Sequence, residues 1–230
     1  MGSPDRTRAV VFDLDGTLLD TAPDLIGSVN RLRRERGLKP IADGLLRPAA
    51  PHGSGPLIRR AFNAEPDDAD FEALRQRFLA IYREHLCDET RPFPGVNDLL
   101  DELDGRGVPW AIVTNKPAWL TEPLLKTLGY WQRAAHVVSG DTVPNRKPDP
   151  LPIRLACERM GVEPGNTITV GDAQRDIRAG KTAGAVALIA LFGYTNGEDR
   201  VCHWGADGLI GHPRELLRWF DWTRGRSIRA

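Results

Sequence analysis

Short apolar runs alternate with stretches of helical periodicity along most of this chain, and this alternation limits the possible folds more than any other feature. The helical stretch at 96–103 places Val96, Leu99, Leu100 and Leu103 on one face. The apolar runs are short and rich in Val and Ile, as buried parallel strands are. We expect strands at Ala9–Phe12, Trp110–Val113, Val137–Val138, Thr167–Val170, Ala185–Ile189 and Gly208–Ile210. The sequence therefore predicts an α/β fold with a Rossmann-like, doubly wound parallel sheet.

One region interrupts the alternation. Between about Asp20 and Glu89 the periodicity is helical, and no run has the pattern of a strand. A Pro- and Gly-rich loop at Arg47–Gly55 separates two amphipathic stretches, whose apolar faces carry Leu25, Ile26, Val29 and Leu32 in the first and Phe71, Leu74, Phe78, Ile81 and Tyr82 in the second. We therefore predict a small all-helical cap domain at 20–89, inserted after the first strand of an α/β core domain formed by 1–19 and 90–230.

The strongest chemical signal is the segment Val11–Thr17, in which Asp13 and Asp15 follow directly on the first apolar strand. In an open parallel sheet, ligands bind beyond the carboxyl ends of the strands. A turn is the plain alternative, because Asp and Gly both favour turns. Taken alone, the segment favours a functional site.

Three further signals lie at comparable places. Asp172 follows the predicted strand Thr167–Val170, and Asp176 lies four residues on, so we expect both carboxylates in the first turn of one helix. Asp172 as a simple helix cap is the alternative. Thr114 ends the strand Trp110–Val113, and Lys147 precedes another helix. A lone lysine is normally a solvated surface charge.

The combined arrangement indicates one site. Asp13, Thr114 and Asp172 all follow carboxyl ends of predicted strands, so one edge of the sheet could gather them. Crowded carboxylates repel one another and would not all ionise unaided. A hard divalent cation resolves this repulsion, and Mg²⁺ is the usual choice where phosphate also binds. An acidic cluster with one Lys and one Thr therefore predicts a phosphoryl-transfer site.

The chain also resembles a known family. Asp13-Leu-Asp15-Gly-Thr, Thr114-Asn115, Lys147-Pro and Gly171-Asp172 with Asp176 are similar to the four motifs of haloacid-dehalogenase-superfamily phosphatases, in the same order. The helical insertion resembles that superfamily's helical cap. Within the superfamily the chain is similar to phosphoglycolate phosphatases. The stretches at 114–117, 47–55 and 203–207 resemble the bacterial N-acetylmuramic acid 6-phosphate phosphatases more closely still.

The resemblance implies a role for each motif residue. Asp13 would be the nucleophile that forms an aspartyl-phosphate and would also bind Mg²⁺. Asp15 would act as general acid and then as general base, with its backbone carbonyl as a further metal ligand. Thr114 and Lys147 would hold the phosphoryl group. Asp172 would bind the metal directly, and Asp176 would support it.

Substrate choice is expected to depend on the cap. We expect Arg47, His52, Gly53 and Ser54 to lie over the substrate, since Arg and His could pair with a carboxylate and Ser with a hydroxyl. The plain alternative is a solvated loop. Asn115 is a further candidate for contact with the substrate or with the lysine.

Other classes of function are less favoured. Dehalogenases of the family lack the second carboxylate, which Asp15 supplies here. A sugar phosphomutase or pyrophosphatase on the same scaffold stays possible, whereas a non-catalytic binding module would be expected to lose part of the acid, Thr and Lys set.

Composition bears on the partners. Lys plus Arg and Asp plus Glu both total 31, so no overall field attracts nucleic acid or a membrane. Three scattered cysteines and the lack of a long apolar N-terminal segment predict a cytoplasmic protein. We expect a small phosphate monoester as the partner, and a monomer or homodimer.

Overall fold

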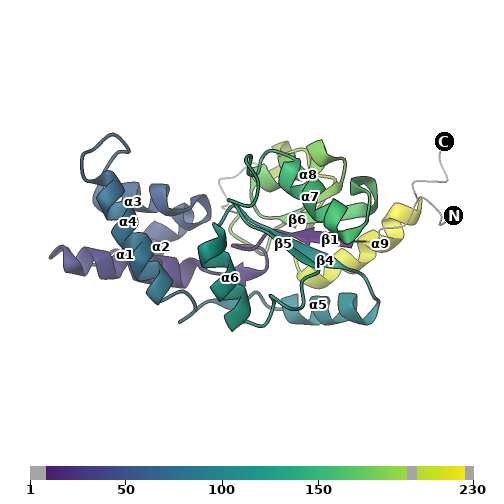
Figure 1. The fold of residues 1–230 in the computed structure, drawn as a ribbon, viewed down its shortest axis with the longest axis horizontal. Helices are drawn as coiled ribbons and strands as arrows, with labels where there is room; N and C mark the ends of the chain where they lie inside the picture. The colour runs from purple at the N-terminus through teal and green to yellow at the C-terminus, as the bar shows by residue number, and fades with distance from the viewer. Residues whose placement is uncertain (1–8, 196–200, 226–230) are drawn as a thin grey trace. The chain divides into compact units, whose positions relative to one another are not determined.

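The computed structural model describes residues 9–195 and 201–225, with side chains through residue 220. The chain divides into two compact units, one made of 1–18 and 92–230 and the other of 19–91. Figure 1 shows the first as a sheet flanked by helices and the second as a group of helices. This α/β sheet and this helical insertion confirm the fold class that the sequence predicts.

The first unit is built on a six-stranded parallel sheet with the strand order β5-β4-β1-β6-β7-β8. Strand β1 lies inside the sheet, where Val11 faces Ala111 of β4 on one side and Thr169 of β6 on the other. All four β1 residues are buried, which explains their apolar character. The strands are β1 (Ala9–Phe12), β4 (Trp110–Val113), β5 (His136–Val138), β6 (Thr167–Gly171), β7 (Val186–Ala190) and β8 (Gly208–Ile210).

Helices cover both faces of this sheet, as in a doubly wound fold. In Figure 1, α7 and α8 lie on one side of the sheet, and α5 and α9 lie on the other. Helix α5 buries Val96, Leu99, Leu100 and Leu103, the face that its periodicity predicts. The helices of this unit are α5 (Val96–Gly105), α6 (Ala118–Thr127), α7 (Leu151–Met160), α8 (Gln174–Ala183) and α9 (Leu216–Gly225), with short 3₁₀ turns η2 (Pro164–Asn166), η3 (Val201–His203) and η4 (Pro213–Glu215).

The second unit contains α1 (Ala22–Glu35), α2 (Asp43–Leu46), η1 (Arg47–His52), α3 (Ser54–Phe62) and α4 (Phe71–Glu84). Helices α1 and α4 bury the two apolar faces expected from the sequence. The prediction of a loop at 47–55 is wrong in part, because η1 and the start of α3 occupy these residues. Pro48 near the start of η1 explains this difference, since proline suits a first helical turn and lacks only a donor that is unpaired there.

Two short strands, β2 (Leu19–Asp20) and β3 (Arg91–Pro92), pair where the chain enters and leaves the helical unit. Beside them, the buried carboxylate of Asp24 accepts hydrogen bonds from Glu89 N at 2.9 Å, from Thr90 N at 2.8 Å and from Thr90 Oγ1 at 2.6 Å. Asp24 therefore holds the two ends of the insertion together. A two-residue strand and a single buried acid leave no periodic signal in the sequence.

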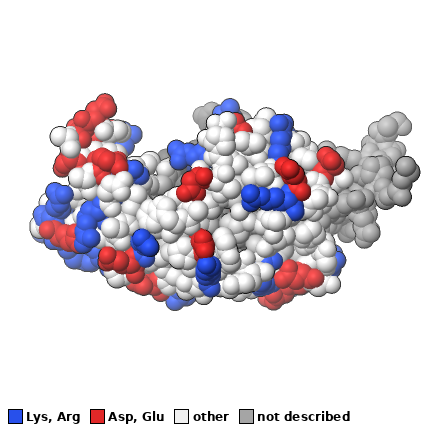
Figure 2. Space-filling view, in the orientation of Figure 1, with Lys and Arg blue, Asp and Glu red and all other residues white. Residues whose placement is uncertain are grey.

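The surface carries mixed charge. On the face drawn in Figure 2, the described Lys and Arg side chains lie interspersed with Asp and Glu. Across residues 9–195 and 201–225, no helix has the length and apolarity needed to cross a membrane.

Candidate active site

The carboxyl ends of three neighbouring strands place the first residues of the site. Asp13 follows β1, Thr114 follows β4 and Asp172 follows β6, and these strands are adjacent in the sheet. The backbone fixes their positions, because Asp13 N donates to Val170 O at 2.9 Å and Thr114 N donates to Val138 O at 3.0 Å. The three side chains are buried. The sheet thus gathers residues that lie up to about 160 positions apart in the sequence.

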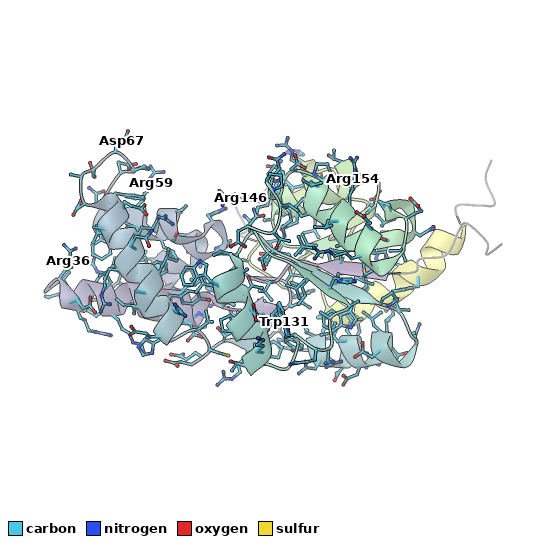
Figure 3. All side chains as sticks on the ribbon, viewed as in Figure 1. Arg36, Arg59, Asp67, Trp131, Arg146 and Arg154 are labelled. Atoms are coloured by element: carbon cyan, nitrogen blue, oxygen red, sulfur yellow. The ribbon has the colours of Figure 1, made fainter. Side chains whose placement is uncertain are left out.

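Lys147 lies in the middle of this acidic group. Its Nζ is 2.7 Å from Asp13 Oδ1 and 2.7 Å from Asp176 Oδ1, and it donates to Val113 O at 2.6 Å. Burial alone would lower the pKa of Lys147, but Asp13 and Asp176 outweigh it and raise that pKa. The neighbouring Arg146, labelled in Figure 3, is exposed. Lys147 is therefore a buried, charged group of the site and not a solvated surface lysine.

Three buried carboxylates form a candidate metal centre. Asp13, Asp172 and Asp176 each offer an oxygen, and these atoms lie within 4.8 Å of one another. Burial and the charge of Asp176 raise the pKa of Asp13 to about 6, against the lowering effect of Lys147. Burial and the charge of Asp13 raise the pKa of Asp172 well above its usual range. Two neighbouring acids, Asp13 and Asp172, whose ionisation is opposed in this way favour a cation beside them.

The donor set fits a hard divalent ion. All three ligands are carboxylate oxygens, which Mg²⁺ prefers. Asp176 Oδ1 is buried and receives no hydrogen bond within the described part of the chain, although Lys147 contacts it as an ion pair. One cationic group, Lys147, thus faces the buried carboxylates of Asp13, Asp172 and Asp176, so negative charge is left over for a divalent ion to neutralise.

Asp176 and Asp172 do not share one helical turn as the sequence suggested. Helix α8 begins at Gln174, so Asp172 precedes it and Asp176 alone lies in its first turn. Asp176 Oδ2 accepts a hydrogen bond from Ala173 N at 3.0 Å, which makes Asp176 the residue that caps this end. Asp172 instead accepts from Thr17 Oγ1 at 2.8 Å and from Tyr194 N at 3.3 Å. The alternative that Asp172 serves only to cap this helix is therefore wrong.

The side chain of Asp15 is not one of the three carboxylates of the candidate metal centre. This side chain is 19% exposed, and its Oδ1 lies 2.8 Å from the Nζ of Lys116, whose side chain is 7% exposed. This ion pair leaves Asp15 on the same loop as Asp13 but with a different partner. Two acids two residues apart thus have different environments, which suits two different chemical roles.

Thr114 and Asn115 belong to a firmly held loop. Thr114 Oγ1 accepts from Lys116 N at 3.1 Å, and Asn115 Nδ2 donates to Lys147 O at 2.8 Å. Gly140 packs against the Asn115 carbonyl so closely that a Cβ would overlap it. Asn115 therefore makes the contact with the lysine segment that the sequence left open, through the lysine's backbone.

The four remaining candidates lie in the helical unit. Arg47 forms an ion pair with Asp20 at 2.6 Å and is 45% exposed. Ser54 Oγ accepts from Arg75 at 3.5 Å, and His52 and Gly53 are exposed. Gly53 has a φ of 87°, a conformation that favours glycine. Their contact with substrate stays a prediction.

Sequence reasoning assigned no role to several residues that contact the site. Thr17 lies inside the first motif, and Lys116 directly follows Thr114-Asn115. Arg175 is half-buried, and although burial lowers its pKa, the charges of Asp176 and Asp13 raise it overall. Gly193 packs against the Gly16 carbonyl, next to Tyr194. The last two follow β7, so the rule about carboxyl ends of strands could have found them.

The chain is similar to known proteins along most of its length. A family model described as haloacid dehalogenase-like hydrolase matches residues 10–190. An N-acetylmuramic acid 6-phosphate phosphatase of Pseudomonas aeruginosa is 41% identical over 94% of this chain and 96% of its own length. A phosphoglycolate phosphatase of Xanthomonas campestris pv. campestris is 44% identical over 94% of this chain and 98% of its own. The crystal structure of a predicted phosphoglycolate phosphatase from Haemophilus somnus superposes with a TM-score of 0.82 at 28% identity, covering 94% of this chain and 99% of that one.

Proposed function

Since the chain belongs to the haloacid dehalogenase-like hydrolase family, we propose that it hydrolyses a small phosphate monoester through an aspartyl-phosphate formed on Asp13. It is a phosphatase of that family. The observation that carries the mechanism is the buried ion pairing of Lys147 with both Asp13 and Asp176, beside Asp172, at the carboxyl edge of the sheet.

In the first half-reaction, an Asp13 carboxylate oxygen attacks phosphorus and the bond from phosphorus to the ester oxygen breaks. The electron pair stays on the departing oxygen, which takes a proton from Asp15 and leaves as an alcohol. Lys147 and Thr114 hold the phosphoryl oxygens while charge shifts among them. Lys147 suits this role because its charge is retained in a buried place.

In the second half-reaction, water attacks the same phosphorus and gives a proton to the Asp15 carboxylate. The bond from phosphorus to Asp13 breaks, and its electron pair restores the Asp13 carboxylate. The net reaction converts a phosphate monoester and water into an alcohol and phosphate. Asp15 ends each cycle protonated, ready for the next leaving group.

We propose Mg²⁺ as the cofactor, held by Asp13, Asp172 and Asp176 with the Asp15 carbonyl, as the family resemblance implies. When bound, Mg²⁺ would neutralise charge on the phosphoryl oxygens. Calorimetric titration of the protein with MgCl₂ tests this assignment without any turnover. We expect saturable binding that Asp172→Asn weakens strongly, and equal binding by the variant would contradict the site.

Two substrates are candidates, 2-phosphoglycolate and N-acetylmuramic acid 6-phosphate. The relatives named for them are similarly close, at 44% and 41% identity. Both compounds carry a carboxylate. We propose that Arg47, His52, Gly53 and Ser54 contact the leaving group of the substrate. Asn115, which contacts the segment of Lys147, is a further candidate for substrate binding. The exposed guanidinium of Arg47 supports a role in binding a carboxylate.

The deciding experiment measures phosphate release with Mg²⁺ from both candidates, from common sugar phosphates and from p-nitrophenyl phosphate. N-acetylglucosamine 6-phosphate is a matched control, because it lacks the lactyl carboxylate of the muramic compound. We expect one carboxylated ester to be preferred, with all turnover abolished by EDTA and by Asp13→Asn. Turnover retained by Asp13→Asn would refute the covalent mechanism. Formation of a bisphosphate from a sugar monophosphate would indicate a mutase instead.

The cellular setting is a further proposal. Cys87, Cys157 and Cys202 are all free thiols, which supports a reducing compartment and hence the cytoplasm. Sedimentation at micromolar concentration would distinguish the monomer from the homodimer.

A further inference from the structure

The ion pair between Lys116 and Asp15 has no assigned role in the mechanism above. Its Nζ to Oδ1 distance is 2.8 Å, and the two side chains are 7% and 19% exposed. Removing two charges from water is unfavourable, so a largely buried pair is weak support for stability. The pair is therefore better explained by the position that it gives to Asp15 than by a contribution to the stability of the fold.

The backbone of Lys116 is fixed at three points. Its N–H donates to Thr114 Oγ1 at 3.1 Å, and its carbonyl accepts from Gly140 N at 2.9 Å and from Thr121 Oγ1 at 3.1 Å. These contacts connect Lys116 to the end of β4, to the segment after β5 and to helix α6. The backbone of Lys116 is therefore held firmly, and its ammonium group can keep the Asp15 carboxylate in one position.

A fixed Asp15 suits both half-reactions. In phosphoryl transfer the attacking and leaving oxygens lie roughly in line with phosphorus. The departing alcohol therefore leaves on the side opposite Asp13, and the hydrolytic water later attacks from that same side. One position of the Asp15 carboxyl can thus serve first as acid and then as base. Small errors in such a position reduce the rate strongly.

We propose that Lys116 is a positioning residue, which holds the Asp15 carboxyl where it protonates the leaving oxygen and later accepts the proton of water. This inference rests on the proposed phosphatase mechanism. It adds a positioning side chain to the four proposed catalytic residues Asp13, Asp15, Thr114 and Lys147.

The test compares leaving groups. An alkoxide needs a proton as it departs, whereas p-nitrophenolate leaves without one. The quantity measured is kcat/KM, which reports on steps through departure of the leaving group. Lys116→Met keeps the length of the side chain and removes its charge. We expect it to lower kcat/KM for the preferred carboxylated alkyl phosphate about 10- to 100-fold, and for p-nitrophenyl phosphate by less than about threefold.

Control variants show whether the effect is specific to the charge of Lys116. Lys126→Met makes the same change on α6, where Lys126 pairs with Glu122 at the surface near Trp131, which Figure 3 labels. It is expected to leave both rates unchanged. Lys116→Arg should restore most of the alkyl rate, and Lys116→Gln, which keeps a hydrogen-bond donor, should give an intermediate rate. Adding Lys116→Met to Asp15→Asn should cause little further loss.

Two outcomes would overturn the proposal. An equal loss on the alkyl and aryl esters would mean that Lys116 supports the loop in general. A rise in KM confined to carboxylated esters, with kcat unchanged and N-acetylglucosamine 6-phosphate unaffected, would mean that Lys116 binds the substrate. Either result leaves the proposed phosphatase activity standing, since wild-type turnover is measured in the same assay.

A crystal structure of Lys116→Met tests the positioning without turnover. We expect the Asp15 side chain to leave its present rotamer, or to occupy more than one. A single, unchanged Asp15 conformation would refute the role of Lys116 even if the wild-type protein hydrolysed none of the esters.

Discussion

Replacing Asp13 by asparagine should remove activity and, in the absence of metal, stabilise the fold. The side chain keeps its size but loses a charge that burial opposes. The pKa of Asp13 is raised from 3.8 to about 6 by burial and by the charge of Asp176. At 1.36 kcal/mol for each unit of pKa, this shift lowers the free energy of unfolding by about 3 kcal/mol when Asp13 is ionised.

The direction of the pH dependence of stability follows from the number of protons bound by the folded and unfolded states. Between pH 3.8 and about 6 the folded protein holds a proton on Asp13 that the unfolded chain has released. The free energy of unfolding therefore falls as the pH rises through this window, and the full penalty is present above it. Asparagine has no such penalty, and the lost pairing with Lys147 is already included in it, because Lys147 lowers the pKa of Asp13 against the effect of burial. We therefore expect a net gain of about 1–3 kcal/mol near neutral pH.

Urea unfolding in EDTA at pH 4.5 and pH 7.5 measures this effect. The stability gained by Asp13→Asn should be small at pH 4.5 and close to its maximum at pH 7.5. Saturating Mg²⁺ should reverse the order, because the ion binds the folded wild type more tightly than the variant. A variant no more stable than the wild type at pH 7.5, or a gain independent of pH, would refute the electrostatic reasoning.

Three other substitutions test separate parts of the structure. Lys147→Met should abolish turnover. It should also lower the free energy of unfolding in EDTA by about 3–5 kcal/mol, because it leaves the buried carboxylates of Asp13 and Asp176 without the ammonium group that pairs with them. Unchanged stability in urea would contradict this reasoning. Asp24→Ala leaves three donors unpaired, two of them buried on Thr90, and should destabilise the helical unit by about 2–5 kcal/mol. This loss is detectable as faster proteolysis within residues 19–91, and wild-type protease resistance would show that the contacts are dispensable. Gly140→Ala forces a Cβ into the Asn115 carbonyl and should lower kcat about 100-fold with the fold retained; wild-type kcat would mean that the loop adjusts freely.

The sequence by itself determined most of the strands and helices, and it indicated the residues of the candidate site. Strands such as Trp110–Val113 occur where Val- and Ile-rich runs predict them, because a strand buried on both faces must be apolar throughout. The pattern of the sequence is enough to indicate Asp13, Thr114 and Asp172, since in a parallel sheet the chain direction alone decides which edge of the sheet each residue reaches.

Tertiary structure decided the pairings between distant segments. Lys147 lies between Asp13 and Asp176, and Lys116 pairs with Asp15, across separations of up to 134 residues. Local sequence could not predict these partners, because a lysine in a loop is usually solvated and its burial depends on how the sheet brings several loops together. The same reason explains why Asp24 was missed: its three donors lie 65 and 66 residues away, and no local periodicity records a single buried acid.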